Sequence, residues 1–146
     1  MKEISAGGVV FKQEGSKIKV LLIEDRYHRL TIPKGKQEAG ETLEQTALRE
    51  IEEETGIKGE IIQPLTKVYY TYTDPKRGHI DKEVMYYLVK ATSGEVEPQL
   101  EEINKVFWLD LHSAWQAQQE NGYDNNDEVF KQAYTYLQSF LNSAEK

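Results

Sequence analysis

The chain has 146 residues, 38% of them hydrophobic, and a formal net charge of −7. This length is enough for one well-packed domain, which we expect to span residues 1–146. The acidic balance argues against general binding to nucleic acid or to an anionic membrane, and the lack of cysteine excludes disulfides and a thiol nucleophile.

The N-terminal segment MKEISAGGVV is too short and too polar for a signal peptide. No apolar run approaches the roughly 20 residues of a membrane-spanning helix. We therefore expect a soluble, cytoplasmic protein, a monomer or a homodimer, with no membrane contact. A chain this acidic is not expected to form a stable complex with nucleic acid.

The first part of the chain is predicted to form strands. Residues 4–11 and 18–23 have the length and composition of two strands joined as a hairpin. Gly7 and Gly8 inside the first strand indicate a close backbone approach or a bulge, with tight packing alone as an equal alternative. A short extended segment, residues 30–32, is expected before a proline.

The stretch 35–57 contains a predicted helix with a signal at each end. Thr42 and Gln45 have the spacing of a capping box, which places the start of the helix after Thr42. Gly56 is suited to the left-handed residue that ends many helices. The sequence therefore predicts a helix between these two positions.

Acidic residues crowd the last turn of that helix, where the dipole favours cations instead. Glu50, Glu53 and Glu54 fall within one arc of roughly 100°, whereas Glu52 points to the other side. Three convergent carboxylates repel unless a cation lies between them, and a hard divalent ion such as Mg²⁺ takes oxygen ligands. Arg49 stands four residues before Glu53 and can hold its carboxylate. A solvated acidic face is the alternative for an isolated run of glutamates.

The second half of the chain adds strands and two helices. Strands are predicted over residues 58–63, 67–73, 83–90 and 106–109, from their β-branched and aromatic content. Residues 111–119 read as a short helix, 120–126 as a linker and 127–141 as an amphipathic helix. This order predicts an α+β protein whose mixed sheet lies between helices, an α/β/α sandwich.

The spacing within 35–57 resembles the Nudix box at every defined position. Those positions are Gly35, Glu41, Arg49, Glu50, Ile51, Glu53, Glu54, Gly56 and Ile57. Nine defined positions over 23 residues are a specific signal. The resemblance implies the Nudix fold, a metal-dependent enzyme, and a loop–helix–loop that holds Mg²⁺ or Mn²⁺ against a pyrophosphate.

The resemblance also implies roles for individual residues. The metal ligands would be Gly35, Glu50, Glu53 and Glu54, with one of the carboxylates as a possible general base. Glu41 matches the box residue that usually pairs with Arg49 and orients the loop. In many relatives a further carboxylate comes from the loop before the last strand. Two glutamates lie in that loop here, and we favour Glu101 over Glu102 as a further ligand or the base.

Outside the box, the chain looks similar to bacterial asymmetric diadenosine tetraphosphate hydrolases. The similarity rests on SAGGV near the start, IPKG before the box, the strand YYTYT, and Lys82 shortly before MYYLVK. It implies cleavage of diadenosine tetraphosphate to ATP and AMP. The predicted substrate-binding residues are Lys34, Tyr70, Tyr72, Lys82 and Tyr86, the lysines for phosphate and the tyrosines for a nucleobase. For a single tyrosine, packing of the sheet against a helix is the alternative, and for Lys34 an exposed surface position.

Several other functions stay open at this point. An 8-oxo-dGTP or other (d)NTP pyrophosphohydrolase is the main alternative, and inositol polyphosphates, sugar nucleotides or RNA 5′ ends are further substrates of the family. Some Nudix domains bind a nucleotide without cleaving it and act as sensors. Such domains tend to lose box residues, whereas this chain keeps them all. The sequence therefore favours an enzyme.

Overall fold

The computed structural model describes residues 1–99 and 103–144, without the side chains of 140–144. The elements, in chain order, are β1 (Lys2–Glu14), β2 (Lys17–Asp25), β3 (Leu30–Thr31), β4 (Lys34–Lys36), α1 (Leu43–Thr55), β5 (Ile57–Asp74), β6 (Gly78–Gly94), β7 (Ile103–Asp110), α2 (Leu111–Asn121), a 3₁₀ turn η1 (Asp124–Asn126) and α3 (Asp127–Ala144). No helix in the described part is long and apolar enough to cross a bilayer.

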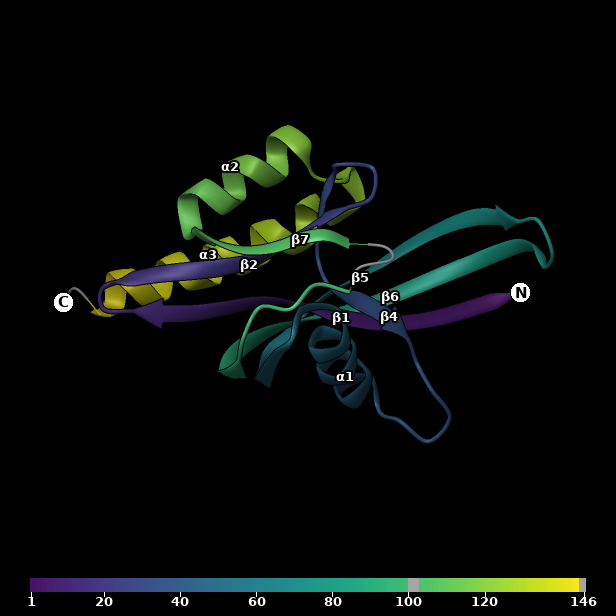
Figure 1. The fold of residues 1–146 in the computed structure, drawn as a ribbon, viewed down its shortest axis with the longest axis horizontal. Coiled ribbons are helices and arrows are strands. Elements are labelled where there is room, and N and C mark those ends of the chain that lie inside the picture. Colours follow the sequence, from purple (N-terminus) through teal and green to yellow (C-terminus); the bar gives the residue numbers. More distant parts are fainter. Residues whose placement is uncertain (100–102, 145–146) are drawn as a thin grey trace.

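A mixed sheet forms the middle layer of the molecule. The strand order is β3-β2-β1-β6-β5, with β4 paired to β1 and β7 paired to β2. β1 runs parallel to β6 and antiparallel to β2 and β4. Helix α1 lies on one face, and α2 and α3 lie on the other (Figure 1). The α/β/α sandwich expected from the sequence is confirmed.

Each face of the sheet has its own hydrophobic core. Ala47 and Ile51 of α1 pack with Val10 and Val89 on one face. Residues of α2 and α3, among them Phe130, pack on the other face with the alternate residues of the strands. This division follows from the strand period of two, which sends successive side chains to opposite faces.

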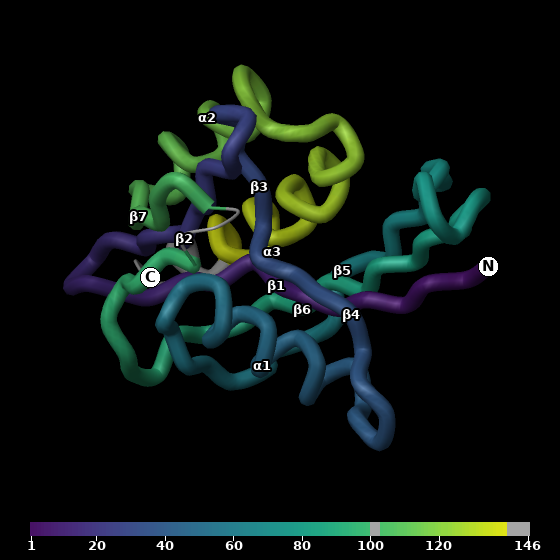
Figure 2. Tube along the Cα trace, turned by 45° about the vertical axis from the view of Figure 1, so that its right-hand side comes forward, coloured from purple at the N-terminus to yellow at the C-terminus, as the bar shows by residue number. Residues whose placement is uncertain are grey.

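The strands β5 and β6 form one long hairpin that extends well beyond the strands expected from the sequence. The expected strands 58–63 and 67–73 are joined in β5, with register shifts between Ile61 and Gln63 and between Pro64 and Lys67. Because β5 is at the edge of the sheet, these shifts accommodate a proline that has no N–H for the ladder. The hairpin end projects away from the helices in both views (Figures 1 and 2).

The glycine pair in β1 marks a close approach, as expected. A Cβ built on Gly7 would lie 2.1 Å from the Pro33 carbonyl oxygen. The Gly8 N–H donates to that same oxygen at 3.2 Å. These contacts let β4 pair with β1, with Ser5 opposite Lys36. A side chain at Gly7 would push β4 off the sheet.

Both helix-end signals around α1 are confirmed. The Gln45 N–H donates to the Thr42 hydroxyl at 3.1 Å, and the Thr42 N–H donates to the Gln45 side chain at 2.8 Å. Gly56 has a φ of 82° and its N–H donates to the Glu52 carbonyl. The helix therefore begins and ends through local contacts within 42–56.

Thr42→Ala is expected to lower the free energy of unfolding by about 1 kcal/mol, because the Gln45 N–H loses its acceptor, the Thr42 hydroxyl. Urea denaturation followed by circular dichroism measures this change. Thr42→Ser is the matched control, since serine caps a helix at least as well. Equal losses in the two variants would show that the cap is not the source of the effect.

Candidate active site

Strand β4 lies against the carboxylates of α1. The Lys34 N–H donates to Glu54 Oε2 at 3.1 Å. A Cβ built on Gly35 would lie 2.0 Å from the Glu50 carboxyl carbon, so only glycine leaves room for that carboxylate. Two of the three convergent glutamates therefore lie directly beside residues 34–35, in the loop–helix arrangement that the sequence indicates.

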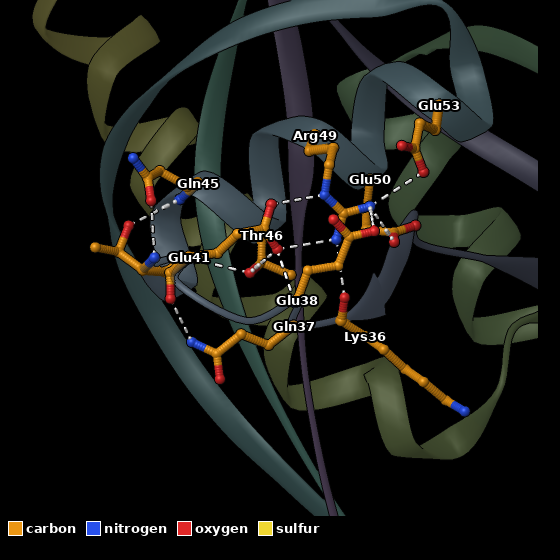
Figure 3. Close-up of polar contacts among 10 residues, drawn as sticks. Lys36, Gln37, Glu38, Glu41, Gln45, Thr46, Arg49, Glu50 and Glu53 are labelled. Atoms are coloured by element: carbon orange, nitrogen blue, oxygen red, sulfur yellow. Dashed lines mark hydrogen bonds and ion pairs between the residues drawn. The ribbon is translucent and has the colours of Figure 1, made fainter.

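The Arg49 guanidinium occupies the centre of the acidic cluster (Figure 3). Its Nη1 contacts Glu50 Oε1 at 2.8 Å and Glu53 Oε2 at 3.1 Å. Its Nε and Nη2 hold the two Glu41 oxygens at 2.7 and 3.0 Å, and Nη2 also donates to the Lys36 carbonyl at 2.9 Å. One cation therefore relieves the repulsion along α1 and ties the helix to the preceding loop.

The environment shifts the pKa values of two carboxyls in opposite directions. Hydrogen bonds from Arg49 and from the Glu38 N–H lower the pKa of Glu41 to about 2. Burial raises the pKa of Glu50, and the adjacent guanidinium only partly offsets this effect. Glu41 is therefore ionised throughout the neutral range. A further cation beside Glu50 would stabilise the ionised form of its carboxyl, which burial disfavours.

The donor set suits a hard divalent cation. Among the described residues, no three His, Asp or Glu side chains are gathered in a metal-binding arrangement. Glu50 and Glu53 both turn to Arg49, and Glu54 turns to the Lys34 N–H. All three nevertheless offer oxygen ligands from adjacent turns of one helix, and Gly35 would add a backbone oxygen. The space that Gly35 leaves for Glu50 is consistent with such a site.

A pocket of about 350 Å³ opens beside Glu54, with lining residues from the hydrophobic cores of both faces of the sheet. Its apolar lining is Ile23, Ile32, Val68 and Ile103, and its aromatic lining is Tyr70, Tyr86 and Tyr123. The polar and charged lining is Asp25, Thr31, Lys34, Glu54, Asn125 and Asn126. The pocket thus joins the carboxylate cluster, through Glu54 and Lys34, to a cavity with aromatic walls.

The predicted substrate-binding residues divide into two groups. Lys34, Tyr70 and Tyr86 line the pocket, although Tyr86 is only 1% exposed and belongs mainly to the core beneath it. Tyr72 and Lys82 are not among the described lining residues. They instead contact Glu3, the tyrosine hydroxyl at 3.1 Å and the lysine Nζ at 2.6 Å. The phosphate contact expected for Lys82 stays a prediction; in this structure its ammonium group contacts the Glu3 carboxylate.

One wall of the pocket comes from a segment that the sequence suggested to be a plain linker. The Tyr123 hydroxyl donates to Asp25, and the Arg29 guanidinium lies 4.6 Å from the centre of the Tyr123 ring. Arg29 also donates to the Gly122 carbonyl at 2.6 Å, and Gln118 donates to the Tyr123 carbonyl at 2.9 Å. The sequence NGYDNN does not predict that Tyr123 lines a pocket, because the contacts that hold this segment come from Asp25, Arg29 and Gln118 in other parts of the fold.

The expected loop carboxylates, Glu101 and Glu102, lie outside the described residues. Ile103, the next residue along the chain, lines the pocket.

Comparison with known proteins gives consistent matches. A family model described as the NUDIX domain matches residues 1–133. The putative mutator protein MutT4 of Mycobacterium tuberculosis is 38% identical over 117 residues, which are 75% of this chain and 46% of that protein. An 8-oxo-(d)GTP phosphatase of Mycolicibacterium smegmatis is 38% identical over 89 residues, 61% of this chain and 26% of that protein. The chain thus spans less than half the length of these two relatives.

Two further matches cover more of the protein compared. The asymmetrical bis(5′-nucleosyl)-tetraphosphatase of Rattus norvegicus is 34% identical over 113 residues, 74% of this chain and 75% of that protein. The crystal structure of a Caenorhabditis elegans Ap4A hydrolase binary complex has a TM-score of 0.69 and 26% identity. That match covers 94% of this chain and 99% of the other. The similarity therefore extends over nearly the whole fold.

Gly35→Ala is expected to weaken binding of Mn²⁺ by about tenfold or more, because the added Cβ takes the place of the Glu50 carboxylate. Isothermal titration of the metal into the folded protein measures this affinity. Gly15→Asn is the control, since asparagine tolerates the left-handed φ of 61° at this turn and the added Cβ would meet no atom within 4 Å. An unchanged affinity in Gly35→Ala would contradict a metal site at this position.

Proposed function

This chain belongs to the Nudix family, and we propose that it hydrolyses a phosphoanhydride bond of a dinucleoside polyphosphate, cleaving diadenosine tetraphosphate to ATP and AMP. The observation that carries this proposal is the junction at Lys34 and Glu54. These two residues line the aromatic pocket and also belong to the carboxylate cluster. A nucleobase in the pocket would place its phosphates at that cluster.

Nudix hydrolases generally use divalent metals, and we assign Mg²⁺ or Mn²⁺ to Gly35, Glu50, Glu53 and Glu54. When bound, the ion would neutralise phosphate charge and lower the pKa of a bound water. The chain itself supplies the positioning. Arg49 aligns Glu50 with Glu53, and Glu41 fixes Arg49 to the loop.

We assign the removal of the proton from the attacking water to this carboxylate set, with Glu101 as a further ligand or the base. A carboxylate within hydrogen-bonding reach of the water is the usual general base in such a site. Lys34 is assigned to a substrate phosphate, because its side chain lines the pocket while its N–H holds Glu54. Lys34 would therefore hold a substrate phosphate close to the Glu54 carboxylate.

The pocket is suited to a purine. Tyr70 offers an aromatic face, and aromatic stacking gives affinity without strict reading of the base edge. Asp25, Asn125 and Asn126 add polar groups to the lining. A substrate with two adenosine ends needs only one of them in this pocket.

An 8-oxo-dGTP pyrophosphohydrolase is the second candidate. The specific observation in its favour is the 38% identity with the mycobacterial 8-oxo-(d)GTP phosphatase, which covers 61% of this chain. The polar wall of the pocket would equally accept an oxidised guanine. Both candidates use the same carboxylates, so they differ only in what the pocket and its surroundings prefer.

Glu53→Gln and Glu54→Gln are each expected to lower metal-dependent kcat/KM by about 10²-fold or more, because each removes a charged ligand. The free energy of unfolding should change by less than about 0.5 kcal/mol. Glu52→Gln is the matched control, since Glu52 lies on the other side of α1 and contacts only Lys58, at 3.9 Å, among the ion pairs of the described residues. Wild-type activity in both test variants would refute the metal assignment.

The substrate is tested by comparing kcat/KM for diadenosine tetraphosphate, 8-oxo-dGTP, ADP-ribose and an RNA 5′-triphosphate. We expect the highest kcat/KM for diadenosine tetraphosphate, with ATP and AMP as products, because its adenine suits the aromatic pocket and its phosphate chain suits the nearby cations. Tyr70→Ala should raise KM by a factor corresponding to about 1 kcal/mol of lost stacking. A tenfold or greater preference for another compound would assign that compound instead and leave the hydrolase chemistry in place.

A further inference from the structure

A buried carboxylate near the start of β1 gathers three cations outside the pocket. The Glu3 side chain is 6% exposed and contacts Lys82 at 2.6 Å, Arg77 at 3.1 Å and Lys36 at 3.2 Å. The Tyr72 hydroxyl donates to the same carboxylate. Burial would raise the pKa of Glu3, but these cations outweigh it and hold the pKa at about 2. Glu3 is therefore ionised at every working pH and keeps the three cations together.

The cluster carries surplus positive charge. Arg77 also contacts Asp74 at 3.4 Å, so three cations face two carboxylates. The cluster therefore has one more positive than negative charge, whereas the chain as a whole has a formal net charge of −7. The two outer cations are accessible, since the Lys36 side chain is 59% exposed and that of Arg77 is 34% exposed.

This cluster lies on the face of the sheet that carries Tyr70 and Tyr86 of the pocket lining. Lys82 is the cross-strand partner of Tyr70, which lines the pocket. Lys34 and Lys36 are two residues apart in β4, so their side chains share a face about 7 Å apart. A chain of phosphates that leaves the carboxylates past Lys34 therefore reaches Lys36 next.

We propose that Lys36 and Arg77, gathered by Glu3, form a second anion subsite that binds the phosphates of the substrate farthest from the carboxylates of α1. The inference rests on the proposed function, which it deepens by selecting long polyphosphate chains over single phosphates. Lys82 is 10% exposed, so it stabilises Glu3 and leaves the contact with phosphate to the two exposed cations. Arg77 presents a guanidinium, whose fork suits phosphate oxygens.

The test is a titration of inorganic tripolyphosphate into the full chain, with EDTA present and at low ionic strength. The double variant Lys36→Ala, Arg77→Ala is expected to bind about tenfold more weakly than the wild type, because two charge-assisted contacts are lost. The matched control is the double variant Lys2→Ala, Lys67→Ala. It makes the same charge change, in β1 and β5, but both lysines pair with Glu83 on the opposite face.

The control is expected to stay within about twofold of the wild type, because its cations lie farther from the ligand and are screened. Equal affinities for the two double variants would overturn the subsite. Hydrolysis of diadenosine tetraphosphate is measured separately with metal. A wild-type protein that does not cleave it would refute the proposed function, while the metal-free titration would still decide whether the subsite exists.

Discussion

The contacts of Arg49 with its surrounding carboxylates support the whole site. Without this cation, Glu50, Glu53 and Glu54 would repel one another at the negative end of a helix dipole. Arg49 also holds Glu41 and the Lys36 carbonyl, so the same guanidinium joins helix α1 to the loop before it. Electrostatic relief and loop position therefore come from one residue, and the cluster keeps its acidic character for a further cation.

Strand β4 transmits this arrangement to the rest of the sheet. Its alternation places Gly35 against Glu50, whereas Lys34 lines the pocket and Lys36 contacts Glu3. The strand can pair with β1 only because Gly7 admits the Pro33 carbonyl. The three residues of β4 thus connect the carboxylates of α1 with the pocket and with Glu3.

The pocket is built from segments far apart in the sequence. The end of β2 and the loop after it hold the segment that follows α2, through the bond from Tyr123 to Asp25 and through Arg29. Gln118 fixes the same segment from the buried side of α2. A wall held from two elements keeps its shape, which a site that selects one ligand requires.

The sequence by itself determined the helix, its caps, the box and the division of the strand residues between two faces. These depend on local spacing, 3.6 residues for Glu50, Glu53 and Glu54 and two for Tyr70 and Tyr72, so they can be read along the chain. Only the tertiary structure decided that Lys82 and Tyr72 serve Glu3, and that Tyr123 closes the pocket. Contacts such as Glu3 with Lys82 join residues 79 positions apart, and no local pattern encodes them. They arise from strand register and helix packing, which the whole chain sets together.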